Sequence, residues 1–275
     1  EHVNNKLFPL GGKSNARTIN CNESGYYSFY NSDRYGFNNP DYEWDQEEIE
    51  FFLIGDSFAL GSCVNRPYDF ASVLRNLSNK SVLNLGYSAN GPLVEYATLV
   101  EYLDPKVKKV LWFYYEENDF RDLDNELSNK ILKNYLQDLI FTQNLKEKQN
   151  KINDLVKKKI KKQIEVKNRE LKKNKLQNSK TKYIKFIKIS NIRSLILPKL
   201  KREKKLKQDI PPEFKKILKL TKDLIIKNNS KLYFIYLPEY NRYKTNYDNT
   251  NYLIVKKIVN ELNIPFIDIN DQVFE

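Results

Sequence analysis

The sequence predicts an α/β protein built on a parallel sheet of five strands. Short apolar runs of the kind found in buried parallel strands alternate with segments whose apolar residues recur about every 3.6 positions. A strand–helix–strand alternation favours parallel pairing through right-handed crossovers. The length of 275 residues suits one large domain, or one domain with an accessory segment.

Each element follows from its local pattern. The predicted strands are the apolar runs at 49–55, 81–87, 108–115, 230–238 and 264–269. The predicted helices cover 67–77, 92–103, 213–229 and 251–263. Pro92 suits the first turn of its helix, where a missing N–H costs nothing. The alternation is interrupted between 120 and 210.

Two segments lie outside this alternation. Residues 1–48 contain many Gly, Asn, Ser, Tyr and Asp residues, and we expect extended pieces and turns. They are too aromatic for a disordered tail, so we expect them to pack on the domain formed by residues 49–275. Within that domain, about 121–210 is predicted to be a Lys-rich helical insertion, in which 145–180 is a solvated helix or a mobile segment.

The charge is concentrated in one region. Residues 146–210 hold 24 Lys and Arg against 6 Asp and Glu, whereas the rest of the chain holds 23 against 29. A solvated face is the ordinary interpretation of such a run; contact with anionic lipid, nucleic acid or an acidic polymer is the alternative. Because the sequence has no helix-turn-helix, zinc-finger or RNA-binding signature, we expect no specific nucleic-acid binding.

Cysteine usage and hydropathy bear on the compartment. Cys21 and Cys63 are either disulfide-bonded, as in an exported protein, or two free buried thiols. No stretch reaches about 18 apolar residues, so no transmembrane helix is expected in this sequence. An exported or periplasmic location is favoured over a cytoplasmic one, although the sequence does not fix the compartment.

Three loops follow the first three predicted strands, and their ends should meet at one edge of the sheet, where parallel sheets place their chemistry. Ser57 follows Gly55 at a strand-to-helix turn, where its hydroxyl is either a nucleophile or a helix cap. The Gly- and Asn-rich loop at 84–92 either directs backbone N–H groups into the cleft or is an ordinary turn. Asn118 offers a neutral donor to an oxyanion, or caps a helix.

These loops together resemble a known family. Gly-Asp-Ser at 55–57, the Gly-rich turn at 86–91 and Asn118-Asp119 are similar to blocks I, II and III of the SGNH (GDSL-like) hydrolases. The segment SDRYGFNNPDYEW also resembles the sequence that precedes the first block in some bacterial members. The resemblance implies a flavodoxin-like, three-layer α/β/α sandwich with strand order 2-1-3-4-5.

The resemblance also implies roles for individual residues. Ser57 would be the nucleophile, and its own N–H, a block II N–H and the Asn118 amide would form the oxyanion hole. Ala89 stands where the family has glycine; it is our first choice of block II donor, on the condition that its φ is negative. Gly86 and Gly91 are the alternatives. In block III, Glu117 replaces the usual glycine and adds a carboxylate.

Block V is missing. The family requires Asp-x-x-His after the last strand, because a serine hydroxyl is a poor nucleophile without a base. The only histidine is His2, and the sequence ends seven residues after Asp268. Either the chain is truncated, which the absence of Met and the end after a strand favour, or it is a pseudoenzyme. As given, we expect little or no hydrolase activity.

The leading hypothesis is a serine esterase or O-acyltransferase acting on a small-molecule or carbohydrate ester, such as an acetylated sugar, with no cofactor or metal. The alternative is a degenerate, non-catalytic domain that binds an acidic polymer or membrane surface. Tyr240, Arg242 and Tyr243 would suit a sugar or a carboxylate, although a surface loop is the simpler interpretation. Glu116, Glu117 and Asp119 do not suggest a metal site, because consecutive acids in a loop rarely face one point.

Overall fold

The computed structural model of the chain describes residues 7–23, 25–181, 210–243 and 247–270. Two compact units are present: Glu1–Asn153 together with Asp209–Glu275, and Asp154–Gln208. His2 and residues 182–209 of the predicted insertion lie outside the described residues.

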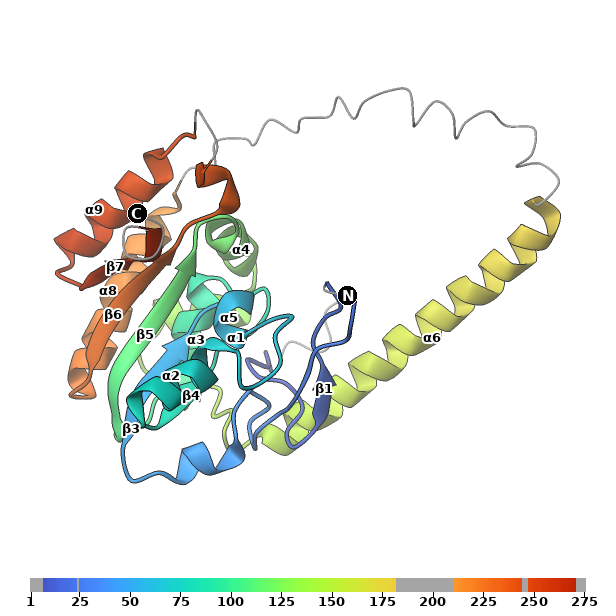
Figure 1. Ribbon diagram of the computed structural model, residues 1–275, viewed down its shortest axis with the longest axis horizontal. Coiled ribbons are helices and arrows are strands. Elements are labelled where there is room, and N and C mark those ends of the chain that lie inside the picture. The colour runs from blue at the N-terminus through green and yellow to red at the C-terminus, as the bar shows by residue number, and fades with distance from the viewer. Residues whose placement is uncertain (1–6, 24, 182–209, 244–246, 271–275) are drawn as a thin grey trace. The chain divides into compact units, whose positions relative to one another are not determined.

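The first unit contains a five-stranded parallel sheet (Figure 1). Its strands, in spatial order, are β4 (Val82–Asn84), β3 (Ile49–Ile54), β5 (Val107–Tyr115), β6 (Lys231–Leu237) and β7 (Phe266–Asp268). This is the order 2-1-3-4-5, so the predicted topology is confirmed. The strands are short and rich in β-branched and aromatic residues, as expected for strands covered on both faces.

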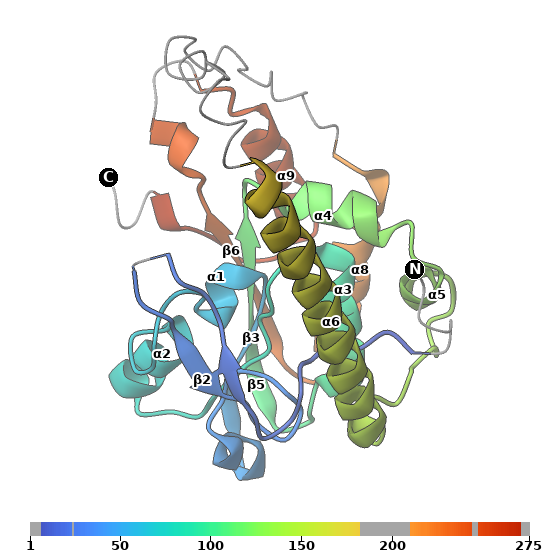
Figure 2. The same ribbon diagram turned by 90° about the vertical axis from the view of Figure 1, so that its right-hand side faces the viewer.

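Helices cover the sheet on both sides, which confirms the three-layer sandwich (Figure 2). α1 (Ser57–Leu60) and α2 (Phe70–Ser78) lie on one face, and α3 (Pro92–Tyr102), α8 (Pro212–Lys227) and α9 (Thr250–Glu261) on the other. The second face is aromatic: Tyr114 stacks on Phe234 and Tyr236 with ring centroids 5.5 and 5.4 Å apart. Phe214 of α8 and Tyr252 of α9 pack against these rings.

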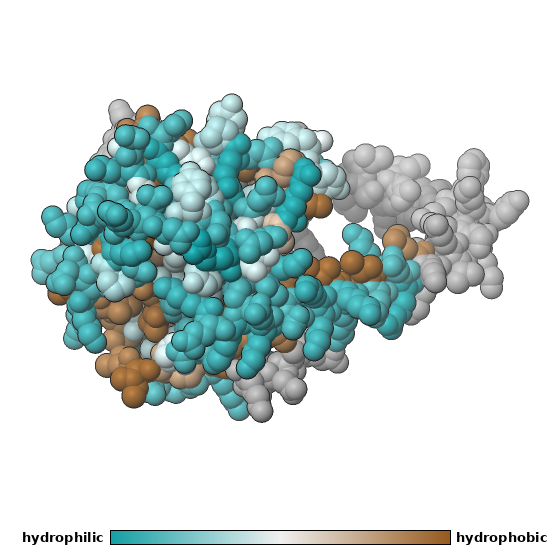
Figure 3. Space-filling view, turned by 90° about the horizontal axis from the view of Figure 1, so that it is seen from below, coloured by the Kyte–Doolittle hydropathy of each residue, from teal (hydrophilic) through white to brown (hydrophobic). Residues whose placement is uncertain are grey.

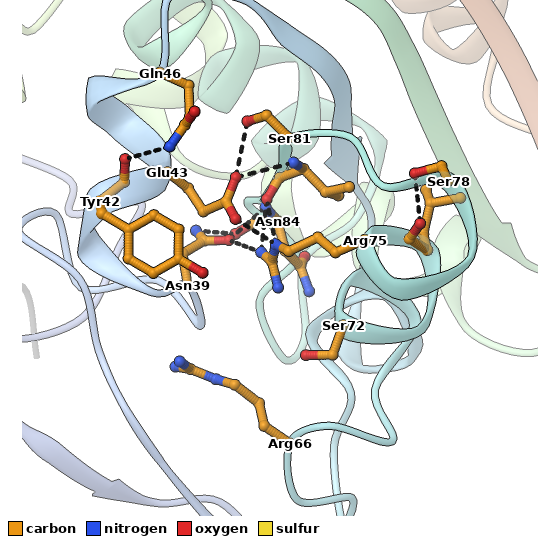
Figure 4. Close-up of polar contacts among 12 residues, drawn as sticks. Asn39, Tyr42, Glu43, Gln46, Arg66, Ser72, Arg75, Ser78, Ser81 and Asn84 are labelled. Carbon is orange, nitrogen blue, oxygen red and sulfur yellow. Dashed lines mark hydrogen bonds and ion pairs between the residues drawn. The ribbon is translucent and has the colours of Figure 1, made fainter.

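The N-terminal segment packs beside β4, an edge strand of the sheet, and contacts it from its start, through Glu43, to its last residue, Asn84, through Asn39. It contains a hairpin of β1 (Arg17–Ile19) and β2 (Phe29–Asn31) and the 3-10 helix η1 (Asp41–Asp45). Glu43 of η1 forms a buried ion pair with Arg75 of α2 at 3.0 Å, and accepts hydrogen bonds from Ser81 and the N–H of Val82 (Figure 4). These contacts attach η1 to α2 and to the start of β4.

A disulfide between Cys21 and Cys63 also attaches this segment. It crosses 42 residues of sequence and joins the β1–β2 hairpin to the loop after α1. The Asn20 side chain donates to the carbonyl of Gly61 at 3.3 Å, which holds the hairpin to the same loop. The sequence left open whether Cys21 and Cys63 form a disulfide or are free buried thiols; in the structure they form the disulfide.

The predicted insertion of 121–210 is divided between the two units. α4 (Asp119–Glu126) and α5 (Lys130–Gln137) belong to the first unit and lie near α3. α6 (Gln149–Thr181) is a long helix that belongs to the second unit from Asp154 onward. None of the helices in the described ranges is long and apolar enough to cross a membrane. The insertion boundaries stay a prediction.

Candidate functional site

The corner between β3 and α1 is shaped by a glycine. Gly55 has a φ of +150°, and a Cβ built there would lie 2.8 Å from the Phe113 carbonyl oxygen and 2.9 Å from the Cβ of Ala59. A side chain would therefore push α1 away from β5. Asp56 caps α1 by accepting the Phe58 N–H at 2.9 Å. The helix cap is thus Asp56, and the hydroxyl of Ser57 is left for another role.

Ser57 and Asn118 meet at one carboxylate. The Ser57 hydroxyl donates to Asp56 Oδ2 at 3.3 Å. Burial raises the pKa of Asp56, and hydrogen bonds from the side chains of Asn118 and Ser57 and from the Ser57 N–H oppose that rise. Asp56 is 1% exposed, whereas Ser57 is half-buried. The structure therefore brings two of the predicted site side chains together at the carboxyl edge of the sheet.

The Asn118 carboxamide is already hydrogen-bonded. Its Nδ2 donates to Asp122 Oδ2 at 2.8 Å, while its Oδ1 is buried without a partner in the described structure. Burial raises the pKa of Asp122, and the bond from Asn118 lowers it. An oxyanion would therefore compete with carboxylates for the N–H groups of Asn118.

Gly86 and Gly91 allow the loop between β4 and α3 to lie close to α1 and α4. A Cβ on Gly86 would lie 2.6 Å from the Leu60 nitrogen of α1, and one on Gly91 would lie 2.8 Å from the Leu123 nitrogen of α4. Their N–H groups are also occupied: Gly86 donates to Asn84 Oδ1 at 2.9 Å, and Gly91 donates to a Glu126 carboxylate oxygen at 2.6 Å. Neither N–H is oriented to serve a substrate in this arrangement.

Ala89 is the remaining block II residue. Its φ is +64°, so the condition that we set for it, a negative φ, is not met. The left-handed conformation explains why glycine is expected at this position. The neighbouring loop is close to the serine corner, because Tyr87 donates its N–H to the Gly55 carbonyl at 3.1 Å. Within the described chain, the Ala89 N–H donates to no acceptor.

Several acids lie buried beneath these loops. Glu95 of α3 is 1% exposed; neither of its carboxyl oxygens makes a well-aligned hydrogen bond in the described structure, although the Trp112 indole N–H is near enough to lower its pKa. Burial raises its pKa well above the ordinary value, and Asp119, Asp56 and Glu126 add to the rise. Asp119 is fully buried, and its pKa is raised for the same reasons. The floor of the site is therefore strongly acidic, which opposes the accumulation of negative charge above it.

Glu126 positions the block II loop. Its carboxylate accepts the N–H groups of Gly91, Leu93 and Val94, and so caps the start of α3. Burial raises the pKa of Glu126 to about 8, although these three donors lower it. The sequence analysis overlooked Glu95 and Glu126. The available signal for Glu95 was an acid inside the mainly apolar stretch 92–103, which also contains Glu101.

The residues Tyr240, Arg242 and Tyr243, which the sequence suggested as a ligand-binding group, follow β6 in the short helix η2 (Tyr240–Tyr243). Arg242 pairs with the buried carboxylate of Glu116 at 3.5 Å and lies 4.0 Å from the ring centre of Tyr252. Tyr240 and Tyr243 are 74% and 49% exposed. The guanidinium of Arg242 therefore packs inside the domain and does not face a ligand, whereas the two tyrosines lie at the surface.

No histidine lies near Ser57 among the described residues, and the carboxylate that contacts its hydroxyl, Asp56, also caps α1. The chain's only histidine, His2, lies outside them. Asp268, at the end of β7, accepts the Asn270 N–H at 3.0 Å and hydrogen-bonds Tyr252. Within the same ranges, no three Asp, Glu, His or Cys side chains could hold a metal ion.

Two cavities lie away from the Ser57 corner. One, of about 220 Å³, lies between α8, β6 and Pro265. The other, of about 320 Å³, is lined by residues of the N-terminal segment and by Arg66. Neither is lined by Ser57, Ala89 or Asn118.

No protein-family model matches the chain, and no curated protein matches its sequence. Solved structures similar to it include a lipolytic protein assigned to the G-D-S-L family from Desulfitobacterium hafniense DCB-2, at 14% identity and a TM-score of 0.39, over 82% of this chain and 79% of that one. They also include AlinE4, a SGNH-hydrolase family esterase, at 11% identity and a TM-score of 0.38, over 83% of this chain and 80% of that one. Such distant likenesses carry no argument about activity.

Proposed function

We propose that the protein is a serine ester hydrolase or acyltransferase of the SGNH type. The observation that carries the proposal is the meeting of Ser57 and Asn118 at the Asp56 carboxylate, beside the loop of Ala89. A hydroxyl, an amide and an N–H without an acceptor then lie on the sheet edge where parallel α/β proteins hold their substrates.

In this reaction the Ser57 oxygen attacks an acyl carbonyl and a base takes its proton. The negative charge on the carbonyl oxygen needs donors. The proposal keeps Ala89 as one of them in spite of its positive φ, because its N–H has no acceptor among the described residues. Asn118 contributes once its amide leaves Asp122, and protonation of Asp122, whose pKa is raised by burial, makes that exchange easier. The leaving alcohol takes a proton, and water or a second alcohol then releases the acyl group.

The described residues contain no histidine that could act as the general base for Ser57. The proposal assigns that role to a histidine outside them, which would have to reach Ser57 from the open side of the corner. Without such a base, turnover of an ester would be very slow, while binding at the site would persist.

The substrate is proposed to be a small-molecule or carbohydrate ester. The ring of Phe58 lies beside Ser57 in the chain, is 44% exposed and contacts Tyr115 with centroids 4.3 Å apart. Such a pair offers an apolar wall for an acyl group or a sugar ring. The Cys21–Cys63 disulfide supports a location outside the cytosol, because structural disulfides persist in oxidising compartments.

The experiment is labelling with a fluorescent fluorophosphonate, which reacts with activated serines. It should be run on the protein expressed from its whole gene, called the complete product below. We expect labelling of the complete product to be abolished by Ser57→Ala. The matched control is Ser62→Ala, five positions further on, whose hydroxyl contacts Ser88 at 3.2 Å; it should leave labelling unchanged. A folded complete product that is not labelled would overturn the proposal.

The second candidate is a non-catalytic binding domain with the same fold. It is favoured by one specific observation: Asn118 is held by Asp122, and the N–H of Ser57 faces Asp56. In that case the unlabelled protein would still bind an ester analogue or a sugar, and the exposed ring of Phe58 would contribute to that binding. Loss of binding in Phe58→Ala without loss of folding would distinguish this candidate.

A further inference from the structure

We propose that α6 is an amphipathic helix that lies on the surface of an anionic lipid bilayer. The proposal concerns the second unit and does not depend on chemistry at Ser57. It rests on a row of exposed apolar side chains, on the charge around that row and on the spacing of the row along the helix.

The apolar row is formed by Ile160, Ile164 and Leu171. They are 46%, 54% and 51% exposed. Positions four and eleven apart differ by about one and three turns, so the three side chains share one side of the helix. Figure 3 shows apolar residues along this helix, bordered by hydrophilic ones. Within the described chain these side chains stay half-exposed, and a helix face of this kind needs a cover.

The charge on the same stretch is positive. Residues 154–171 contain seven Lys and Arg and three Asp and Glu, which gives +4. Lys158, Lys162 and Arg169 are about half a turn from the apolar row, and Lys157 and Lys167 lie beside it. Two of the acids are close to basic neighbours, as in the contacts Lys157–Asp154 at 3.9 Å and Arg169–Glu165 at 3.8 Å. Val166, 43% exposed, lies away from the row, so the row is the apolar cluster and not the whole apolar content of the helix. A basic helix with such a row is suited to the boundary between anionic headgroups and acyl chains.

Spacing argues against a partner helix. A heptad drawn through Ile160, Ile164 and Leu171 puts Lys157 and Lys167 at the other seam positions, where a coiled coil needs apolar side chains. At a bilayer the same lysines can extend their long stems over the apolar side and keep their ammonium groups among the headgroups. Nucleic acid would use the lysines but would leave the three apolar side chains exposed to water.

The test is flotation of the full chain with vesicles of phosphatidylcholine and phosphatidylglycerol at a ratio of about 3:1, compared with pure phosphatidylcholine vesicles. We expect binding to the anionic vesicles only, and we expect it to weaken in high salt. The triple variant Ile160→Gln, Ile164→Gln, Leu171→Gln should bind at least about tenfold more weakly. Its matched control is Leu77→Gln, Leu139→Gln, Ile140→Gln, which removes apolar side chains that are 82%, 70% and 89% exposed elsewhere.

The charge is tested separately with Lys158→Gln, Lys159→Gln, Lys161→Gln, which should weaken binding by about 100-fold. Its control is the triple variant Lys133→Gln, Lys216→Gln, Lys219→Gln, which removes three exposed lysines of α5 and α8. Equal binding by wild type and both α6 variants, each with an unchanged unfolding transition, would overturn the proposal. The proposal would also be overturned if the protein bound a single-stranded oligonucleotide but no vesicles. It would be overturned as well if the protein formed a concentration-dependent dimer that the apolar triple variant abolishes.

Discussion

Helix α3 carries two buried glutamates, and their surroundings differ. Glu101, near its end, accepts hydrogen bonds from the Tyr135 hydroxyl at 2.6 Å, the Thr142 hydroxyl at 3.0 Å and the N–H groups of Gln143 and Leu145 at 2.5 and 2.9 Å. Glu95, near its start, makes no well-aligned hydrogen bond with either carboxyl oxygen in the described structure. The two side chains are 8% and 1% exposed, so burial does not explain the difference.

The same contrast separates the N-terminal segment from the edge of the sheet at Ser57. In the N-terminal segment, Asp33 and Glu43 are buried and accept several hydrogen bonds. Where the strands end, Glu95 and Asp119 are buried with oxygens that lack partners. Burial raises the pKa of Asp33 as well, but its four hydrogen bonds oppose that rise. Buried carboxylates that lack such donors and lie near other acids cost free energy and are often found at functional sites. The contrast therefore singles out the Ser57 edge.

The largest effect should come from Asp33. Its carboxylate accepts the N–H groups of Tyr35 and Phe37 at 2.9 Å each, the Asn39 amide at 2.9 Å and the Trp44 indole at 2.8 Å. Asp33→Ala leaves these donors without an acceptor, so we expect a loss of about 3–5 kcal/mol in the free energy of unfolding. Urea denaturation measures it.

The control for Asp33 is Asp41→Ala, nearby in the same segment. Asp41 pairs with Arg34 at 2.8 Å, and its side chain is 45% exposed. An exposed pair contributes about 0–1 kcal/mol, so this variant should unfold close to wild type. If both substitutions cost the same, the partners of Asp33 do not explain its contribution.

Glu101→Gln should have the next largest effect. Gln keeps the size of the side chain but replaces one acceptor oxygen with an NH₂ group, which would face an N–H or hydroxyl donor. We expect a loss of about 1–3 kcal/mol, together with faster hydrogen exchange at Gln143 and Leu145. A variant as stable as wild type would show that these four contacts do not hold the 142–145 loop.

Glu95→Gln should raise the free energy of unfolding, whereas the two substitutions above lower it. The pKa of Glu95 is raised by burial and by neighbouring acids, so the folded protein holds a proton that the unfolded chain releases above about pH 4.5. The stability from this group is complete below that pH and is lost as the pH rises through the folded pKa. Wild type should therefore lose stability between about pH 5 and 9, and Glu126, with a pKa of about 8, contributes in the same direction.

At pH 8, Glu95→Gln should raise the free energy of unfolding by about 1–3 kcal/mol, because it removes a buried ionisable group that lies near other acids. At pH 5 the two proteins should be nearly equal. Asp41 and Asp45, whose pKa values are lowered by Arg34, act in the opposite direction but below about pH 4, outside this window. Thermal melts from pH 5 to 9 test this, and a flat profile for wild type would contradict it.

Much of the sheet could be predicted from sequence because parallel strands and amphipathic helices have local signatures. The strand 49–55 and the helix 92–103 lie within a few residues of β3 and α3. The strand order came from the resemblance, since no local pattern determines which strands are neighbours. The contacts of the N-terminal segment depend on pairs far apart in sequence, such as Glu43 with Arg75, and single-sequence patterns do not encode them.

At the site, the sequence placed Ser57 and Asn118 on one edge but could not show what holds them. The partners of Asn118 depend on rotamers that only packing fixes. Glu95 and Glu101 interrupt an apolar helix, but the sequence does not show whether an acid there is buried or lies at the surface. The sign of φ at Ala89 was likewise set by the loop between β4 and α3.

The smallest effect should come from Ala89→Gly, at the open edge of the same site. A φ of +64° is unfavourable for alanine by about 1–2 kcal/mol and free for glycine. The gain is partly offset because glycine gives the unfolded chain more freedom, so we expect a net rise of up to about 1 kcal/mol. The control is Ala97→Gly inside α3, which should lose stability. Since the substitution keeps the N–H in place, labelling of Ser57 should persist in the complete product. A loss of labelling with a gain in stability would show that the strain at Ala89, and not merely its N–H, serves the site.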